Sequence, residues 1–224
     1  MKKELYSFTL WHNSGFMEKQ IISDIKKKFE IFRSFEIKWN EENFSRNLSR
    51  FYGKKSSKEF QKEKELGLGS FKFFLVYDNN PQYSEGKNIN IDKSKHEYCR
   101  LTGGGNLVDA DNNAFDTNEH LLLLFGKSIK DFEAEGRKAE TFFYNHDPVG
   151  CPCWPSLEQA LSTVRKIPFT HVKAYKNSYL IHSKNADCTR RILNAESRFS
   201  IPGIHKYSIK VGKQKQPIYI RQIH

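Results

Sequence analysis

The sequence has 224 residues, of which 38% are hydrophobic and 14% aromatic, so it can fold around one large core or two smaller ones. Its formal net charge is +11, which favours anionic partners because a basic surface concentrates anions around it. The longest apolar run, Leu121 to Phe125, is far shorter than the roughly 18 residues that a membrane-spanning helix needs. We therefore expect no membrane span.

The cysteines and the start of the sequence predict a cytoplasmic protein. No apolar segment typical of a signal peptide precedes Trp11, so we expect the four cysteines to stay reduced. His146, Cys151 and Cys153 are of the residue types that bind zinc. The Cys-Pro-Cys spacing is one residue shorter than that of common zinc motifs, so we expect free thiols rather than a zinc site.

Hydrophobic periodicity predicts five elements in the first third of the chain. Alternating residues favour strands at residues 5–11 and 31–39, and residues 71–77 are apolar enough for a strand that is buried on both faces. Apolar residues at helical spacing favour helices at residues 16–29 and 41–52.

Two polar segments interrupt this pattern. Residues 54–66 predict either an exposed helix or a mobile loop, and residues 82–98 predict a loop.

A glycine-rich stretch at residues 103–105 is the strongest local motif. Glycines leave backbone amides accessible, so an anion such as a phosphate can bind there. A short apolar strand at residues 107–108 follows, and the polar residues at 109–113 are competent N-caps for a helix that ends near Phe125. Glycine-rich turns also occur in hairpins that bind no ligand, and that alternative stays open.

The order of these elements predicts an α+β fold. It suits an antiparallel sheet with helices on one face, the ferredoxin-like or split βαβ arrangement. Residues 148–155 are rich in helix and strand breakers, so we predict domains at residues 1–147 and 148–224. The second is expected to be a small α+β unit with helices at 156–166 and 185–194 and strands at 169–175, 178–182, 205–211 and 216–223.

The first 126 residues resemble a nucleoside diphosphate kinase domain in the spacing of their motifs. Residues 8–15 lie where that family has a strand and a Lys-Pro-Asp-Gly turn, with His12 at the phosphate-binding lysine. Tyr52 and Phe60 match two aromatic residues that lie over the nucleotide base. Residues 104–112 overlay the family's Gly-Arg-Asn and His-Gly-Ser-Asp catalytic stretch.

The resemblance implies a phosphate-binding site with altered chemistry. The family's nucleophilic histidine falls on Asp109, and the glutamate that orients it falls on His120, so acid and imidazole have exchanged places. Asn106 is kept, and Arg100 or Lys95 stands in for a phosphate-clamping arginine. The implied ligand-binding residues are His12, Tyr52, Phe60, Arg100, Gly104, Gly105 and Asn106.

The exchange limits the chemistry that this site can perform. A carboxylate facing a γ-phosphate adds a like charge, so Asp109 is a poor phosphate acceptor without a metal. Either the site binds a nucleotide without turnover, or Asp109 and Asp111 hold Mg²⁺ for phosphoryl or nucleotidyl transfer, with His120 at the reacting end. The simpler alternatives are that Asp109 caps a helix and that His120 is a partly buried helix residue.

The second unit weakly resembles a nucleotidyltransferase remnant in the order of its elements. That chemistry needs two or three carboxylates around magnesium, and Asp187 is the only aspartate after Pro155. We therefore expect a docking or scaffold element. Its basic strands are expected to face an anionic partner through Lys206, Lys210, Lys213, Lys215 and Arg221.

Two functions follow from the sequence. The first is a protein that binds a nucleotide or another phosphorylated small molecule, has a kinase-like fold and lacks the usual nucleophilic histidine. The alternative is a non-enzymatic basic module that binds RNA or an anionic assembly partner, because basic and aromatic residues alternate around Arg50 and Phe51. The oligomeric state stays open, a homo-oligomer included.

Overall fold

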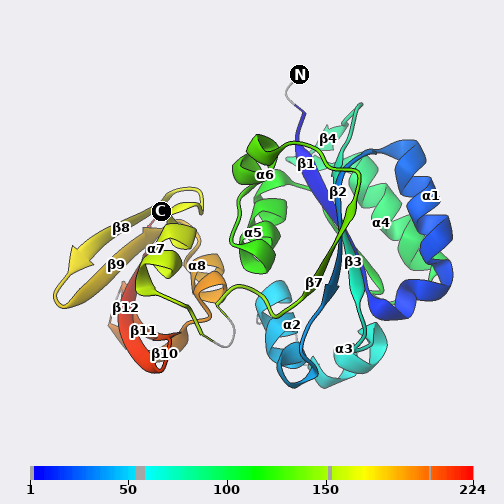
Figure 1. Ribbon diagram of the computed structural model, residues 1–224. Helices are drawn as coiled ribbons and strands as arrows, with labels where there is room; N and C mark the ends of the chain where they lie inside the picture. Colours follow the sequence, from blue (N-terminus) through cyan, green and yellow to red (C-terminus); the bar gives the residue numbers. More distant parts are fainter. Residues whose placement is uncertain (1–2, 54–58, 151–152, 202, 224) are drawn as a thin grey trace. The chain divides into compact units, whose positions relative to one another are not determined.

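The computed structural model describes residues 3–53, 59–150, 153–201 and 203–223. Within them the chain forms two compact units, each with its own five-stranded sheet (Figure 1). Among these residues, no helix is both long and apolar enough to cross a membrane. Unit 1 consists of Met1–Ser45, Lys58–Thr117 and Asp131–His146, and unit 2 consists of Arg46–Ser57, Asn118–Lys130 and Asp147–His224.

The sheet of unit 1 has the strand order β6-β1-β3-β2-β7. All neighbouring strands are antiparallel except the pair β2 and β7, which is parallel. Strand β3 lies between β1 and β2, although β1 connects to β2 through helix α1 (Glu18–Lys28). The strands are β1 (Leu5–Leu10), β2 (Glu30–Lys38), β3 (Phe71–Tyr77), β6 (Val108–Asp111) and β7 (Thr141–Asn145).

Apolar side chains cover both faces of this sheet. Phe8 pairs with Phe74 on the face that packs against α1 and α4 (Ile89–Leu101). On the opposite face, Phe35 pairs with Phe73, and Phe132 of α6 (Ile129–Glu135) packs edge-on against Phe35 at 5.8 Å. The expected α+β class is therefore present, but helices are not confined to one face because strand β3 is apolar on both sides.

Helix α4 contradicts the loop expected at residues 82–98. The Oδ1 atom of Asn88 caps this helix by accepting hydrogen bonds from the amides of Asn90, at 2.9 Å, and Ile91, at 3.3 Å. The buried side chains Ile91, Ser94 and Tyr98 form a narrow stripe on it. Only two of the three are apolar, so the helical period is weak in the sequence.

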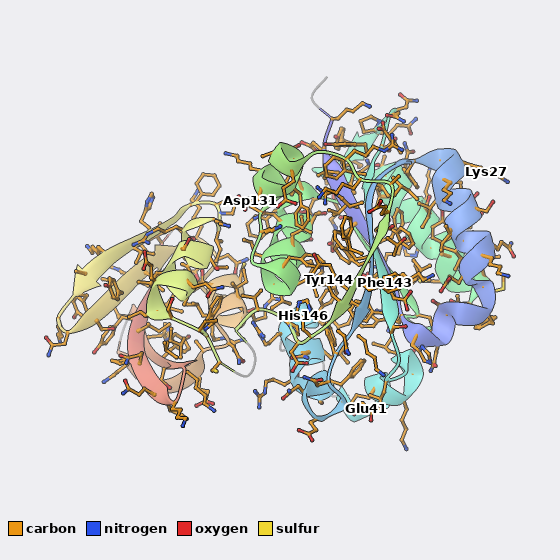
Figure 2. All side chains as sticks on the ribbon, in the orientation of Figure 1. Lys27, Glu41, Asp131, Phe143, Tyr144 and His146 are labelled. Carbon is orange, nitrogen blue, oxygen red and sulfur yellow. The ribbon has the colours of Figure 1, made fainter. Side chains whose placement is uncertain are left out.

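Strand β7 and a set of shorter elements complete unit 1, and two of these elements, α2 and α5, have residues in both units. Strand β7 is an edge strand on which Phe143 is 76% exposed, and Tyr144 meets His146 edge-on at 5.0 Å (Figure 2). The remaining elements are η1 (His12–Met17), η2 (Glu41–Asn43), α2 (Phe44–Tyr52), α3 (Glu59–Leu66), β4 (Tyr83–Ser84), β5 (Lys87–Asn88) and α5 (Ala114–Phe125).

Unit 2 is a small α+β unit with the strand order β10-β11-β12-β9-β8. Its neighbouring strands are antiparallel except β9 and β12. The two expected helices are confirmed as α7 and α8, which lie side by side (Figure 1) and are capped by Ser156 and Asn185. The elements are α7 (Leu157–Arg165), β8 (Thr170–Tyr175), β9 (Ser178–Ser183), α8 (Ala186–Leu193), β10 (Glu196–Ile201), β11 (Ile204–Val211) and β12 (Gln214–Gln222).

The core of unit 2 lies between these helices and one face of the sheet. Leu161 and Ile192 from the helices pack with Ile181, Ile218 and Ile220 from the strands. Trp154, which is fully buried, donates from its indole nitrogen to the carbonyl oxygen of Leu193 at 2.9 Å. Leu122 of α5 belongs to the same core.

Candidate functional site

Asp109 and Asp111 lie in edge strand β6, so the alternative that Asp109 caps a helix is wrong. The Oδ1 atom of Asp109 forms an ion pair with Lys95 of α4 and accepts from the amide of Ala110 at 2.9 Å. Burial alone would lower the pKa of Lys95, but the charge and hydrogen bond of Asp109 raise it above its usual value. Asp111 accepts a hydrogen bond from the Ser7 hydroxyl at 2.5 Å. A divalent cation at Asp109 would have to displace the lysine.

The glycine loop ends helix α4. Gly103, Gly104 and Gly105 all have positive φ angles, of +82°, +91° and +74°. The amide of Gly103 donates to the carbonyl of Arg100 at 3.1 Å and that of Gly104 donates to the carbonyl of Cys99 at 2.8 Å, an arrangement that satisfies the last carbonyls of a helix. These two amides therefore already have intramolecular acceptors.

The next amide in this loop binds a carboxylate of the protein itself. The amide of Asn106 donates to Oε1 of Glu65 at 3.0 Å, and a side chain at Gly105 would collide with the same oxygen. Asn13 also reaches this corner by donating to the carbonyl of Glu65 at 2.7 Å. The structure thus places Gly105 and Asn106 close to the segment that contains His12 and Asn13. The amide of Asn106 there already binds one negatively charged group, the carboxylate of Glu65.

His12 and Arg100 are both exposed in unit 1. The Nδ1 atom of His12 lies 3.3 Å from the carbonyl oxygen of Ser70, and its ring occupies the space where a side chain at Gly69 would be. Arg100 is in the last turn of α4.

His120 and Tyr52 belong to unit 2, whereas Asp109 belongs to unit 1. The ring of His120 stacks on Phe51 with centroids 3.8 Å apart, and its Nε2 atom lies 3.2 Å from the Phe51 carbonyl oxygen. Tyr52 meets Phe51 edge-on at 5.3 Å. The side chain of Phe60 lies outside the described residues.

Metal ligands were expected at Asp109 and Asp111. In the described part of the chain, no group of three or more His, Cys, Asp or Glu side chains is arranged to hold a metal ion. Cys99, Cys153 and Cys188 are free thiols, and Cys151 lies outside the described residues.

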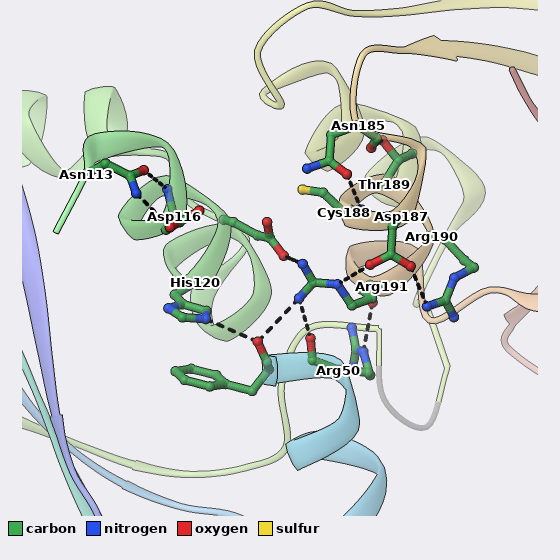
Figure 3. Close-up of polar contacts among 12 residues, drawn as sticks. Arg50, Asn113, Asp116, His120, Asn185, Asp187, Cys188, Thr189, Arg190 and Arg191 are labelled. Atoms are coloured by element: carbon green, nitrogen blue, oxygen red, sulfur yellow. Dashed lines mark hydrogen bonds and ion pairs between the residues drawn. The ribbon is translucent and has the colours of Figure 1, made fainter. Parts of the chain in front are cut away.

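A buried polar network in unit 2 is centred on Arg191 of α8 (Figure 3). Its guanidinium pairs with Glu119 and Asp187 and donates to the carbonyls of Arg50 and Phe51. Arg50 in turn donates to the carbonyl of Arg191 at 2.9 Å. Because these contacts join backbone segments of one unit, the network has the character of a structural support.

The face of the unit 2 sheet turned away from its core carries basic and aromatic side chains. Val172, Ile181 and Ile220 pair with one another on the core side of the sheet. Because successive residues of a strand alternate between faces, the residues before and after each of them lie on the other side. Paired residues form rows across this face: His171, His182 and Arg221 form one, and Lys173, Leu180, Tyr219 and Lys206 form another. We call it the basic face; it consists of His171, Lys173, Tyr175, Leu180, His182, Lys206, Lys210, Lys215, Tyr219 and Arg221.

Two tyrosines lie among these cations. Tyr175 and Tyr219 meet edge-on with centroids 5.0 Å apart, and the ammonium of Lys206 is 5.8 Å from the Tyr219 ring centroid. Lys173, Lys210 and Arg221 are exposed, as is Lys215, which pairs with Glu196 at 2.7 Å. Among the residues whose side chains are described, Glu196 is the acidic group on this side of the sheet.

Only part of this face was predicted from the sequence. Lys206, Lys210, Lys215 and Arg221 were expected and lie on it, whereas Lys213 lies between β11 and β12. His171, Lys173 and Tyr175 of β8 and His182 of β9 were not expected. The available signal was the alternation within residues 171–175, where the odd positions are basic or aromatic. Which strands are neighbours, and so which residues share a face, was not visible in the sequence.

Comparisons with known proteins give no match: neither a protein-family model, nor a curated protein, nor a solved structure resembles this chain significantly.

Proposed function

We propose that unit 2 binds single-stranded RNA on its basic face. The observation that supports this function is the gathering of cations and two tyrosines on one face of a sheet whose other face is packed with helices. Sheets of this kind bind single-stranded RNA by stacking bases on aromatic rings while basic side chains neutralise the phosphates.

The chemistry of the face fits a nucleic acid better than a small anion. Lysine and arginine side chains lie on β8, β12 and β11, and His182 lies on β9 between β8 and β12, so the basic face spans four adjacent strands from Lys173 to Lys210. Such a surface matches a chain of phosphates rather than a single one. Tyr175 on edge strand β8 and Tyr219 on the central strand β12 are both partly exposed on this face. Their rings have no charge to attract a phosphate, and they are suited to stacking against a base.

The test is binding of a fluorescently labelled single-stranded RNA to the full chain at several salt concentrations. We expect the affinity to fall log-linearly with salt, and Lys173→Ala to lower that slope by about 0.7, the value for one phosphate contact on a single strand. Tyr219→Ala should weaken binding by about 1–3 kcal/mol, whereas Tyr219→Phe should retain most of the affinity because it keeps the stacking ring.

Lys19→Ala is the matched control, because Lys19 is an exposed lysine of α1 in unit 1 and its loss changes the net charge equally. Equal effects of Lys19→Ala and Lys173→Ala would contradict the proposed face. Equal affinity for RNA and for polyphosphate, which has no bases, would favour the anionic assembly partner instead.

A second candidate is a nucleotide or phosphorylated small molecule bound to unit 1. The order β6-β1-β3-β2, with α1 and α4 on one face, supports a ferredoxin-like arrangement and with it the resemblance to nucleoside diphosphate kinases. The contact of Glu65 with the amide of Asn106 favours an anion position in the glycine loop. Mg²⁺ at Asp109 and Asp111 belongs to this candidate, and so does any phosphoryl or nucleotidyl transfer.

Thermal unfolding with nucleoside mono-, di- and triphosphates, with and without magnesium, tests this candidate. If a phosphate takes the place of the Glu65 carboxylate, Glu65→Gln should increase the stabilisation by nucleotide, because it removes a competing negative charge. A ligand at 100 times its dissociation constant adds about 2.7 kcal/mol. Glu63→Gln on the same helix is the control, and no stabilisation of either variant would exclude the site.

A further inference from the structure

His171, His182 and Arg221 form a row across three adjacent strands of the basic face. His171 of β8 pairs with His182 of β9 in the antiparallel register, and His182 pairs with Arg221 of β12 in the parallel register. Side chains paired in this way point to the same face, with Cβ atoms about 5 Å apart in an antiparallel pair. Two imidazoles and a guanidinium therefore lie next to one another.

The middle residue of this row has an unsatisfied polar atom. The Nε2 atom of His182 is buried and has no hydrogen-bond partner among the residues that the structure describes. His182 as a whole is only partly buried, and His171 and Arg221 on either side of it are exposed. A buried ring nitrogen without a partner costs stability, and a ligand held by the exposed side chains on either side would offset that cost.

The surroundings of His182 also oppose its protonation. Burial lowers the pKa of His182 below its ordinary value of 6.5, and the neighbouring Lys173, Arg221 and His171 lower it further. These charges come from the two strands that flank β9, and all of them are basic. An anion placed in the row would reverse this effect, because a nearby negative charge favours the imidazolium form.

We propose that His171, His182 and Arg221 form a subsite for one RNA phosphodiester, and that His182 takes up a proton when the phosphate binds. This inference rests on the proposed function of unit 2. Arg221 and His171 hold the phosphate oxygens, since both are exposed donors. His182 lies between them and couples the affinity to pH.

The sign of the pH dependence follows from the lowered pKa. As the pH falls below 6.5, the unfolded chain binds a proton at this histidine before the folded chain does, so the free protein loses stability. RNA binding should instead strengthen over the same range, because the bound phosphate raises the proton affinity of His182. One linked proton changes the affinity by at most about tenfold per pH unit, or about 100-fold over two units, and this limit applies only between the pKa values of the free and the bound form. We therefore expect RNA affinity to rise by about tenfold, and by less than about 100-fold, between pH 7.5 and 5.5.

The experiment measures RNA affinity across this pH range for the full chain and for His182→Gln. For each chain, the affinity at pH 5.5 is compared with its own affinity at pH 7.5, and we expect His182→Gln to lose most of the rise at low pH. His96→Gln is the control, because His96 is an exposed histidine of α4 in unit 1. An unchanged pH response in His182→Gln would overturn the proposal.

A second measurement separates this inference from the proposed function. Nuclear magnetic resonance of the imidazole nitrogens gives the pKa of His182 with and without inorganic phosphate, so it needs no RNA binding. A rise in this pKa with phosphate, abolished in Arg221→Gln, is the expected result. If the pKa does not respond to phosphate, the subsite is wrong even where RNA binds; if it responds and RNA does not bind, the RNA proposal fails alone.

Discussion

The single side chain of Arg191 connects several segments of unit 2. It is 13% exposed, and its partner Glu119 is 7% exposed, so the pair is largely removed from water. The same guanidinium binds backbone carbonyls of Arg50 and Phe51 (Figure 3). Removing one partner of a buried pair leaves the other charge uncompensated, which is more costly than the pair itself is stabilising.

We predict that Arg191→Ala lowers the free energy of unfolding by about 3–5 kcal/mol. The adjacent Arg190→Ala is the control, because Arg190 pairs with an Asp187 that is 54% exposed, and exposed pairs contribute about 0–1 kcal/mol. Urea denaturation of both variants measures the difference. Similar losses in the two variants would show that the Arg191 network is not a structural support.

Single residues were predictable where their role depends on neighbours in sequence. Asn113 accepts from the amide of Asp116 at 2.9 Å, and Ser156 accepts from the amide of Gln159 at 3.1 Å, as expected of helix caps. Asp109 was not predictable, because its ion pair depends on Lys95. Lys95 lies in α4, a helix whose pattern did not reveal it.

Helices and strands, too, were predictable where the local sequence determines them and not where distant contacts do. Strand β3 was predicted with its observed bounds, Phe71–Tyr77, because a continuous apolar run followed by a turn identifies it without other information. Strands β7 and β10 were not predicted. Both are edge strands. In β7 exposed residues alternate with residues that are only partly buried, so the strand has no buried apolar face that would identify it in the sequence.

The glycine loop illustrates what an element can hide. The three consecutive glycines were expected to leave their backbone amides accessible to an anion, and in the structure all three have positive φ angles. The sequence did not show that the first two end a helix, nor that Glu65 from α3 lies against the third. Amides that the local sequence leaves without a partner donate hydrogen bonds once the neighbouring helices have formed.

On the scale of the whole molecule, unit 2 consists of three separate segments of the chain. Besides residues 147–224 it includes Arg46–Ser57 and Asn118–Lys130, so helices α2, α5 and α6 each have residues in both units. The breaker-rich segment at 148–155 is visible in the sequence. The long-range contacts that assign the two earlier segments to unit 2 are not.

These earlier segments supply contacts that unit 2 needs. Leu122 is part of its core, and the amide of Val149 donates to the carbonyl of Leu123 at 3.0 Å. Arg50 donates to the carbonyl of Ile192 at 2.9 Å, and Glu119 neutralises Arg191. A fragment that starts at residue 147 lacks all of them.

We therefore predict that residues 147–224 alone do not fold. The fragment loses apolar core area and leaves Arg191 without its buried carboxylate, and the loss of one buried partner alone costs about 3–5 kcal/mol, a large part of the stability of a small domain. Circular dichroism on heating and amide dispersion in nuclear magnetic resonance spectra measure this, with the full chain as the control. A cooperative thermal transition in the fragment would show that the breaker-rich segment, and not the contact pattern, marks the limit of an independent domain.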